Sequence, residues 1–564
     1  MAFTVGDLGH VIEHNAMANQ ILGKVNTSDI GTTIDTATAG YISTGGVSAT
    51  KTALVGVLKK RAWLASDHGV VGDGVANDGP ALNMLLIDAA AAGARVLLAQ
   101  NSVLSIRTRV FVPSNTRLDG QSATLRNDMT ASPGDIVLQI NNVSNVLIEN
   151  LNIDGNKAAY ATVTEFKHGI SMTQASRVTL RGVTSNRNKG DGVYVGGTVT
   201  AFCSDIVLDR VTCDANHRNG LSIISVKGFQ ATSSKFTRSS GTNPQAGLDL
   251  EPNTADAPME RIKFIACEFT ENTNQGIDVA AWSARTVKQG DVDFIGCSAD
   301  GNFGSGVKMV TGDGIRFIGG SISRNADKGV WFSSAAGTTS EVLFQGVRIV
   351  ENAGKGVLTD AGFSGLTFSA CRVYGNTTAA ASIGLDIIPV AASTDLKVVG
   401  CSLGGATQTH GLRTGANVSN TVIVGNSYPD VGIAVSLSDN PASRTTFGAE
   451  GASLVATSVT RSASGSTGAG FRSPTDTVDK VLVRCDGSIG FSSGTAAADA
   501  TLARLGVGVL GVGAGHVLRT GRNATGSRPS AAVAQVGSMF FDTTLAKPIW
   551  SDGTVWRDGA GTAV

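Results

Sequence analysis

The chain has 564 residues, with 45 lysines and arginines against 45 aspartates and glutamates, and 71 glycines beside only 12 prolines. This balance of charge gives no overall field that would draw the protein to nucleic acid, an anionic membrane or a polyanion, so any charged ligand must be bound locally. Abundant glycine without proline suits strands and turns rather than a disordered linker, and the length predicts several domains or one repetitive body with appendages.

The ends of the chain and its cysteines exclude further classes. The first residues lack the basic stretch and apolar core of a secretion signal, and no run of about eighteen apolar residues is long enough to insert into a membrane. Seven cysteines lie scattered between Cys203 and Cys485 with no Cys-x-x-Cys pair and no clustered histidines. We therefore expect a soluble chain with no metal or cofactor, whose cysteines are reduced and buried.

The first 62 residues predict a helical segment. Apolar residues recur at intervals of three and four with one polar interruption, at Leu8, Val11, Asn15, Ala18, Leu22 and Val25. Such a stripe suits a short trimeric helix bundle or, equally, a surface helix. A stretch rich in Thr, Gly and Ala at 26–50 resembles a linker.

A second helix is expected over residues 81–92. Asp78 precedes it as a candidate N-cap, and Gly93 follows it as a stop signal. Repetitive folds need such caps, because an open end would expose apolar side chains and unpaired strand edges.

An internal repeat then governs the sequence. A glycine followed by an apolar residue recurs every 23 to 30 residues, at Gly169, Gly192, Gly220, Gly247, Gly276, Gly306, Gly329, Gly356, Gly384 and Gly411. Alternating apolar residues precede each glycine and often end in an asparagine, as in Val178, Leu180, Val183 and Asn188. Alternation with period two predicts short strands, and two or three strands per repeat predict one coil of a parallel β-helix.

Equivalent residues of successive coils should stack in ladders about 4.8 Å apart. An asparagine ladder is expected in a tight turn, where left-handed backbone is tolerable and side-chain amides bond from coil to coil. Cys267, Cys297, Cys371 and Cys401 share a ladder position with Val183 and Val347, which predicts that they lie in the core.

The C-terminal region predicts a different β structure. Residues 446–530 contain short alternating strands with Gly and Ser, plausible for a small domain that joins three chains. Beyond them, residues 537–556 predict an aromatic hairpin about the turn dipeptide Asp552-Gly553.

Two stretches resemble known virus proteins. Residues 67–127 are similar to the opening of the pectate-lyase-like superfamily as found in bacteriophage tailspikes, although Asn77-Asp78 stands where the family has two acids. Residues 537–556 resemble the terminal tag of many phage tail fibres. The resemblance implies an all-β fold, a right-handed parallel β-helix in a homotrimer, with residues 1–62 for attachment to other phage tail proteins, 63–430 for the β-helix and 431–564 for trimerisation. It also implies a place in the virion tail, acting on a polysaccharide at the host cell surface.

Candidate catalytic residues lie on the outward side of the repeat. Two positions after each repeat glycine, the ladder reads Ser171, Tyr194, Ser222, Asp249, Asp278, Lys308 and Trp331. Glu251 follows Asp249 by two residues and so shares its face. Three acids this close should raise the pKa of at least one, which suits a general acid beside a carboxylate base or nucleophile. The alternative is a solvated set of strand acids answered by Lys308.

The sequence around these acids, at residues 216–223 and 241–253, resembles a motif of pectate-lyase-like and NosD-like β-helix proteins. It implies that His217, Arg218 and Gln245 belong to the same site as Asp249 and Glu251. Lys308 and Tyr194 face the same ladder, and Trp282 and Trp331 are candidates for stacking on sugar rings, or for contacts within the fibre.

Three functions fit these features. The favoured hypothesis is a depolymerase that hydrolyses a polysaccharide. A second is a lyase of uronate-containing glycans, which would use Arg218 and Lys308 as cations and His217 as the base. A fibre that binds its receptor without catalysis, or an architectural tail protein, is the alternative of a different class.

The trimer is directly testable. The exposed sides of a long solenoid and the strand-rich C-terminal region predict that the full-length protein sediments as a trimer at micromolar concentration. Sedimentation as a monomer under the same conditions would contradict this prediction.

Overall fold

The computed structural model describes residues 62–564 apart from several internal segments. Those segments are 131–134, 162–164, 255, 281–289, 334–337, 377–382, 406–407, 432, 438–444, 449–466, 472–480, 485–487, 492–499, 507–508 and 513–519. The expected N-terminal helix lies outside the described residues. The chain forms two compact units, Met1–Ser458 and Val459–Val564, which are described separately.

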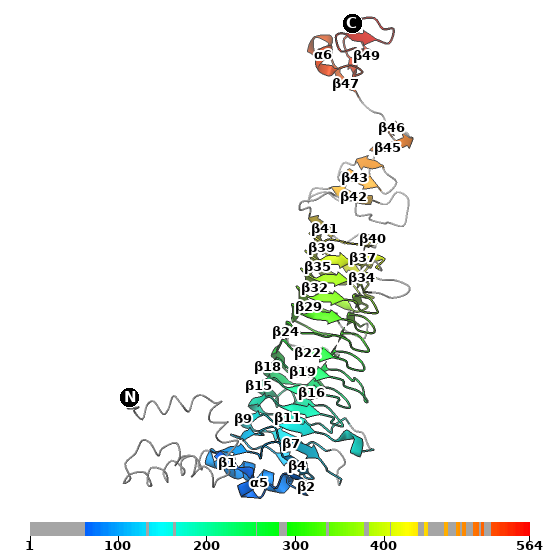
Figure 1. Cartoon of the computed structure of the whole chain (residues 1–564). Helices are drawn as coiled ribbons and strands as arrows, with labels where there is room; N and C mark the ends of the chain where they lie inside the picture. Colours follow the sequence, from blue (N-terminus) through cyan, green and yellow to red (C-terminus); the bar gives the residue numbers. More distant parts are fainter. Residues whose placement is uncertain are drawn as a thin grey trace, which may run out of the picture. The chain divides into compact units, whose positions relative to one another are not determined.

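The first unit contains three parallel sheets, and most coils give one strand to each of them (Figure 1). The first sheet pairs β1 Ala62–Leu64, β3 Arg95–Leu97, β6 Arg117–Asp119, β9 Ser144–Glu149, β12 Ser176–Arg181, β15 Cys203–Asp209, β18 Val226–Thr232, β21 Met259–Ile265, β24 Val292–Ile295, β26 Ile315–Ile318, β29 Thr338–Gln345, β32 Gly362–Ser369, β35 Ser393–Val399, β39 Thr421–Val424 and β41 Thr445–Gly448, with β38 Val418–Ser419 beside β35. The parallel ladder therefore continues to residue 448.

The second sheet is divided into two stretches. Its first stretch pairs β2 Asp73–Asn77, β4 Val103–Ile106, β7 Thr124–Asn127, β10 Asn152–Asp154, β13 Thr184–Asn186, β16 Thr212–Asp214, β19 Lys235–Thr237 and β22 Glu268–Thr270. Its second stretch pairs β27 Ser321–Ser323, β30 Arg348–Val350, β33 Arg372–Tyr374 and β36 Ser402–Gly404. Isolated bridges through Ser298 join the two stretches.

The third sheet has 13 strands and carries the candidate site. It pairs β5 Val110–Phe111, β8 Leu138–Asn141, β11 Ile170–Thr173, β14 Val193–Gly196, β17 Leu221–Ile223, β20 Leu248–Leu250, β23 Ile277–Val279, β25 Val307–Met309, β28 Val330–Phe332, β31 Val357–Thr359, β34 Ile383–Ile387, β37 His410–Thr414 and β40 Ile433–Leu437. The parallel β-helix predicted from the repeat is thus confirmed. Among the described residues of 110–430, helical structure is limited to the short 3-10 helix η2, Lys157–Ala159.

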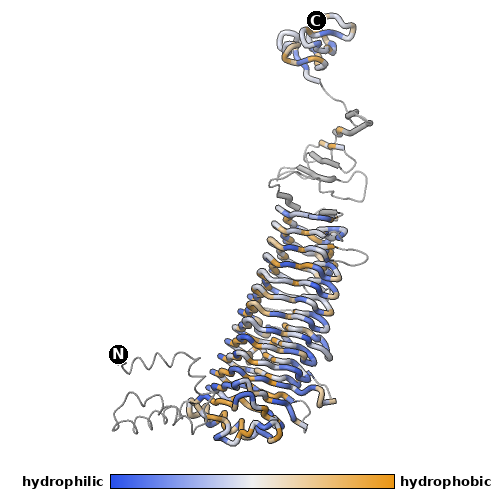
Figure 2. The backbone as a smooth tube through the Cα atoms, in the orientation of Figure 1, coloured by the Kyte–Doolittle hydropathy of each residue, from blue (hydrophilic) through white to orange (hydrophobic). Residues whose placement is uncertain are grey.

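Side chains that alternate inward along the strands fill the core. Hydrophobic residues recur at the same places on successive coils (Figure 2). The clearest example is a file of stacked rings from the first sheet, Phe264, Phe294, Phe317, Phe344 and Phe368, with centroids 4.6 to 5.1 Å apart. That interval equals the strand spacing, so each ring packs face to face on the ring of the next coil.

The repeat glycines are required by close approach. A Cβ added to Gly276 would lie 2.8 Å from the carbonyl oxygen of Gly306 and 2.7 Å from the side-chain nitrogen of Asn302. Both atoms belong to the next coil. A larger residue would therefore push neighbouring coils apart, which explains why a glycine directly precedes the strands of the third sheet from β11 to β31.

The asparagine ladder bonds from coil to coil as expected. The Asn302 amide donates to Asn325 Oδ1 at 2.9 Å and to Phe269 O at 3.0 Å, and it accepts from the Asn272 amide at 3.0 Å. The left-handed backbone, however, belongs to the residue before the asparagine, such as Arg187 (φ 53°), Glu271 (φ 58°) and Arg324 (φ 53°). The asparagines themselves are buried and use their amides to satisfy the backbone of the turn.

The six described cysteines are free and buried, as predicted. Cys485, the seventh, lies outside the described residues. Their burial explains their recurrence at a core position, because a thiol packs as a small hydrophobe.

Helix α5, Gly79–Ala92, covers the first coils (Figure 1). Its Leu82, Leu85 and Leu86 join the core, and it ends at Gly93 in left-handed conformation (φ 65°) as predicted. Asp78 occupies the N-cap position but its carboxylate does not cap the helix. It accepts backbone N–H groups of Val71 at 2.7 Å and Gly72 instead, and so fixes the loop that follows the 3-10 helix η1, Ala65–His68.

The second unit contains two small sheets. One is antiparallel and comprises β42 Thr467–Phe471, β43 Val481–Arg484, β44 Ile489–Phe491, β45 Ala500–Gly506 and β46 Val509–Val512. The other comprises β47 Gly521–Asn523, β48 Met539–Asp542, β49 Lys547–Ser551 and β50 Trp556–Asp558, with η3 Thr525–Ser527 and α6 Ala531–Ala534 between β47 and β48. The predicted hairpin is β49 and β50, which pair antiparallel about Asp552-Gly553. In the described part of the chain no helix is long and apolar enough to cross a membrane.

The asparagine ladder gives a stability prediction. Asn302→Ala leaves buried groups on both neighbouring coils without partners, so it should lower the free energy of unfolding by about 2 to 4 kcal/mol. Asn141→Ala removes an exposed asparagine bonded only to Thr173 and should change stability by less than about 0.5 kcal/mol. Chemical denaturation of both variants checks this, and equal effects would contradict it.

Candidate functional site

The outward ladder of the third sheet has the predicted register. Ser222 pairs with Asp249, Asp249 with Asp278, Asp278 with Lys308 and Lys308 with Trp331. Earlier in the ladder, Ser171 pairs with Tyr194 and Tyr194 with Ser222. The two aspartates therefore occupy equivalent positions on adjacent coils, where like charges directly opposite are unfavourable.

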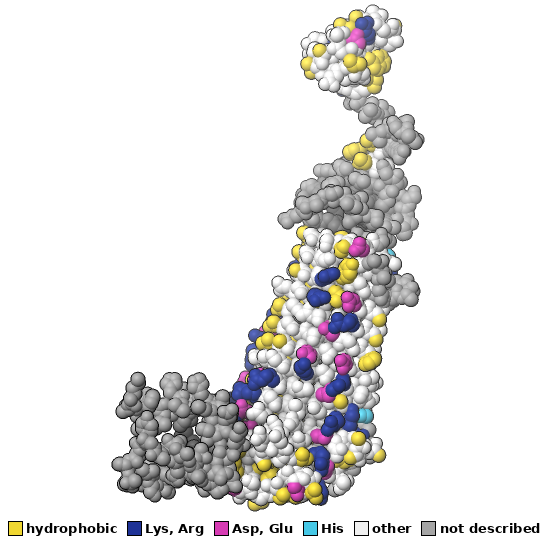
Figure 3. Space-filling model, viewed as in Figure 1, with side chains coloured by type: hydrophobic (Ala, Val, Ile, Leu, Met, Phe, Trp, Pro, Cys, Tyr) yellow, Lys and Arg dark blue, Asp and Glu magenta, His cyan; other side chains and the backbone are white. Residues whose placement is uncertain are grey.

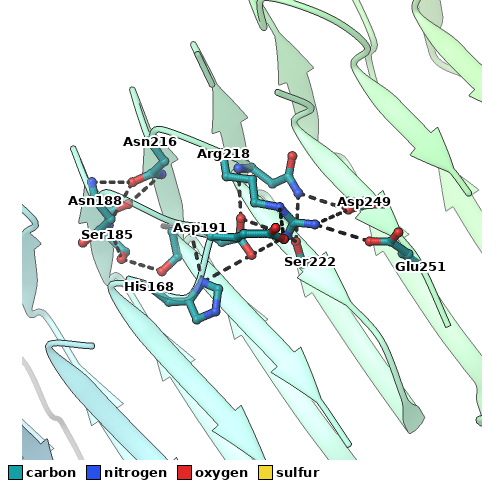
Figure 4. A network of polar contacts seen from close by, with 12 residues as sticks. His168, Ser185, Asn188, Asp191, Asn216, Arg218, Ser222, Asp249 and Glu251 are labelled. Atoms are coloured by element: carbon teal, nitrogen blue, oxygen red, sulfur yellow. Dashed lines mark hydrogen bonds and ion pairs between the residues drawn. The ribbon is translucent and has the colours of Figure 1, made fainter. Parts of the chain in front are cut away.

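Arg218 is the centre of the site and brings acids from several coils together (Figure 4). Its guanidinium nitrogens lie 3.2 Å from Asp191, 3.6 Å from Asp249, 3.3 Å from Glu251 and 3.9 Å from Glu165. Burial opposes the charged form of Arg218, but the surrounding carboxylates outweigh burial and raise its pKa. The cation is thus committed to acids of its own chain.

Asp249 is the most enclosed of the predicted acids. Its side chain is 1% exposed and accepts the Asn219 amide at 3.1 Å. Burial, followed by the charges of Glu251 and Asp278, raises the pKa of Asp249 well above its usual value, and Arg218 opposes this only in part. Glu251 is different, because its side chain is 40% exposed while it shares Arg218 Nη2 with Asp249.

Asp278 is buried on the next coil. Lys308 Nζ lies 3.7 Å from its Oδ2, while its Oδ1 has no hydrogen-bond partner among the described residues. Burial raises the pKa of Asp278, Lys308 opposes that rise, and Glu251 adds to it. Asp249 and Asp278 therefore both favour the protonated form and titrate under each other's influence.

A third buried aspartate of the same ladder provides a contrast. The Asp386 carboxylate accepts hydrogen bonds from Arg413 Nε at 2.6 Å and Nη2 at 2.7 Å, and Lys355 Nζ lies 2.5 Å from it. Here a cation is the ladder neighbour, since Arg413 pairs with Asp386 on the next coil. Such a bidentate pair is a structural solution. Asp249 and Asp278 are instead ladder neighbours of each other, so no bidentate pair neutralises them in this way.

The structure adds residues that the sequence reading missed. Asp191 contacts Arg218, and His168 stacks on Tyr194 with ring centroids 4.6 Å apart. His168 Nδ1 accepts the Asp191 backbone N–H at 3.2 Å, and burial lowers the pKa of His168, so the ring is neutral. The signal was present, because His168, Asp191 and Asn219 each directly precede a repeat glycine and so form a ladder of their own.

Three of the predicted binding residues, Gln245, His217 and Trp331, lie apart from the acids. The Gln245 side chain accepts Gly241 N–H and donates to Asn243, so it serves its own loop. The His217 ring packs against Gly241, where an added Cβ would lie 2.3 Å away. Trp331 donates to Asp360 at 2.9 Å, with Lys328 Nζ 4.5 Å from the ring centre. Trp282 lies outside the described residues.

The site has no evident means of holding a metal ion. Within the described ranges of the chain, no group of three or more His, Cys, Asp or Glu side chains is arranged to bind one. On the face shown in Figure 3, acidic and basic side chains are interspersed along the β-helix unit. The carboxyl groups and Arg218 on the third sheet are of the kind that take part in proton transfer and charge stabilisation.

Comparison with known proteins identifies the fold family. The model of the right-handed β-helix region family matches residues 96–291 and 260–447, so the chain belongs to this family. No curated protein sequence matches the chain.

Several solved structures with similar folds belong to proteins of different kinds. They include the A-module of mannuronan C-5 epimerase AlgE4 from Azotobacter vinelandii, with 15% identity, TM-score 0.49, and 68% of this chain and 99% of that chain covered. Tailspike protein 3 of bacteriophage CBA120 has 13% identity, TM-score 0.37, and coverages of 90% and 70%. The Dettilon tailspike protein has 10% identity, TM-score 0.46, and coverages of 67% and 68%. At these identities the likeness concerns the fold alone, and the right-handed β-helix predicted from the sequence is confirmed by the family match.

The raised pKa of Asp249 predicts how stability depends on pH. An acid whose folded-state pKa is raised stabilises the fold while it is protonated, and that contribution is lost as the pH rises through the folded-state value. Asp249→Asn keeps the shape without the charge, so its unfolding temperature should exceed that of the parent protein by an amount that grows from acid to neutral pH.

Asp205→Asn is the matched control, because Asp205 is exposed and its left-handed backbone (φ 53°) also suits asparagine. Its difference from the parent protein should stay constant over the same pH range. A constant difference for Asp249→Asn as well would contradict the raised pKa.

Proposed function

We propose that the chain is a phage tailspike or tail fibre protein that binds a host cell-surface polysaccharide along its third sheet and depolymerises it by hydrolysis. The observation that carries the proposal is a protonation-prone carboxyl, Asp249, beside an exposed carboxylate, Glu251, with both on one nitrogen of Arg218. Glycoside hydrolysis needs such a pair, one group to protonate the leaving oxygen and one to attack or to activate water.

The environments of the acids assign their roles. Asp249 is the general acid, because burial and neighbouring acids keep its proton at a pH where an ordinary aspartate is ionised. Glu251 is the base or nucleophile, since it contacts Arg218 and is open to solvent. Asp278, one strand further along, also has a raised pKa, and when it is ionised its charge raises the pKa of Asp249 further.

The geometry favours hydrolysis over β-elimination at these acids. A lyase needs a cation free to neutralise a uronate. Arg218 is occupied by four carboxylates, and Lys308 contacts Asp278 at 3.7 Å. Neither cation is available for a carboxylate of the polymer at this patch.

The place of the protein in the virion is part of the same proposal. It rests on the sequence resemblance of residues 67–127 to tailspike openings and of 537–556 to tail-fibre tags. Residues 1–62 would attach the fibre to other tail proteins, and three copies would form the fibre that acts at the host cell surface.

A second candidate is a receptor-binding fibre without catalysis. One observation favours it, namely that Asp249 is 1% exposed and Asp191 is fully buried, so the Arg218 network lies largely beneath the surface. Buried ion networks of this kind also occur for structural reasons. Catalysis would then require substrate to reach Asp249 past Glu251.

Amide substitutions distinguish the two candidates. Asp249→Asn and Glu251→Gln should each lower the rate of polysaccharide cleavage by about 10²- to 10⁴-fold and leave glycan binding nearly unchanged, and Asp278→Asn should lower it less. Sizing of the products from host surface polysaccharide measures the rate, and absorbance of an unsaturated product in the near ultraviolet would reveal elimination instead.

Asp205→Asn serves again as the control and should retain full activity. If the parent protein binds the polysaccharide but never shortens it, the non-catalytic fibre is correct. If all three amide variants cleave normally, catalysis takes place elsewhere on the molecule.

A further inference from the structure

A basic cluster lies beside the acids, at the turn between the second and third sheets. We use this name for Lys157, Lys189 and His217. Lys189 directly follows Asn188 of the asparagine ladder, and His217 follows Asn216 one coil further. The coils are in direct contact here, because His217 N–H donates to Asn188 O at 2.9 Å and Lys157 Nζ donates to Ala215 O.

The cluster adjoins the Arg218 site without sharing its acids. Arg218 is the next residue after His217, and its backbone N–H donates to Gly190 O at 3.2 Å. The guanidinium turns to the carboxylates of the third sheet, whereas His217 lies against Gly241. One turn therefore separates a basic cluster from an acidic one.

Among the described residues, Lys189 has no anionic partner. The residue is 8% exposed, yet no hydrogen bond or ion pair from the described residues reaches its ammonium group. The aliphatic part of the Lys189 side chain is therefore buried, while its ammonium group stays open to solvent and to a ligand. The cluster is therefore incomplete as the chain alone builds it.

Asp214 is the acid that raises the pKa of Lys157, but other side chains already bind its carboxylate. The carboxylate accepts both Arg238 nitrogens at 2.7 and 2.5 Å and the Thr237 hydroxyl at 2.9 Å.

Positive charges in and around the cluster make the charged forms of these three side chains less favourable. Burial lowers the pKa of Lys157, Lys189 and His217. Neighbouring positive charges lower each pKa further: Lys189 acts on Lys157, and Lys167 acts on Lys189. Both Lys189 and Lys157 act on His217. Lowered pKa values are expected for cationic groups that have no anion beside them.

We propose that the basic cluster of Lys157, Lys189 and His217 is a binding site for an oxyanion, a carboxylate, phosphate or sulfate group carried by the polysaccharide. The inference rests on the proposed function and narrows it to an anionic polymer. Lysine ammonium groups bind carboxylates and phosphates as point charges. The neighbouring acids around Arg218 would repel such a group, so the two clusters together fix which part of the polymer lies where.

The test uses small anions and the full chain, so it does not depend on cleavage. Glucuronate, phosphate and sulfate at about 50 mM are compared with sodium chloride of equal ionic strength and with neutral glucose. A ligand that binds only the folded protein raises its unfolding temperature, here by about 1 to 3 °C at saturation. The variant is Lys189→Gln, and Lys263→Gln, an exposed lysine of β21 on the first sheet, is the matched control.

We expect the parent protein and Lys263→Gln to gain stability with at least one of the anions, and Lys189→Gln to lose that gain. In sodium chloride Lys189→Gln should be at least as stable as the parent protein, because the substitution relieves repulsion. A gain with glucuronate identifies a carboxylated sugar, and a gain with phosphate or sulfate alone identifies those substituents. No gain with any anion, or an equal gain in Lys189→Gln, would overturn the proposal.

Binding of native and carboxyl-reduced host polysaccharide separates this inference from the proposed function. Lys189→Gln should weaken binding of an acidic native polymer about tenfold and leave binding of its carboxyl-reduced form at the level of the parent protein. If the parent protein binds neither polymer, the proposed function fails while the small-anion result still decides the oxyanion site.

Discussion

Stacking of parallel coils in register is the constraint on which the rest of the structure depends. Hydrogen bonds between successive strands hold equivalent residues about 4.8 Å apart, so each position in the coil must suit a neighbour of its own kind. Phenyl rings, amides and thiols tolerate this, as the Phe264 file, the Asn302 amides and the paired positions of Cys267 and Cys297 illustrate. Carboxylates do not tolerate it unless a cation or a proton intervenes.

Both solutions occur on the third sheet. Asp386 has Arg413 as its ladder neighbour and is neutralised by the fold itself. Asp249 has Asp278 as its neighbour, and Arg218 reaches it from a turn while contacting three other acids as well. Asp249 and Asp278 thus keep a raised pKa, because Arg218 and Lys308 offset their burial and the neighbouring acids only in part. Acid-base chemistry requires groups in this condition, and stability alone would favour removing it.

The part of this arrangement that was predictable from sequence is the part that periodicity governs. Period-two alternation and the repeat glycines fixed the register, so the neighbouring positions of Asp249, Asp278, Lys308 and Trp331 followed directly. The cap helix and the hairpin at Asp552-Gly553 followed from local signals in the same way. The side chains of turn residues obey no such period, because their directions depend on backbone angles that vary between coils. Arg218 pointing to the acids, His217 pointing to Gly241 and the Asp78 carboxylate bonding backward to Val71 could not be predicted for that reason.

Turn side chains would also allow one strand ladder to bind a charged polymer. The strands supply rows with a fixed spacing, which suits any extended chain, while the turn residues decide the sign of the charge beside each row. Around Asp249 the turns bring Arg218 toward the sheet, and among the described residues no acid forms an ion pair with Lys189 or Lys157 at the edge. An anionic polymer on the third sheet would therefore meet attraction at the edge and repulsion at the acids. Its neutral glycosidic linkages, rather than its charged groups, would then be the parts directed toward Asp249 and Glu251.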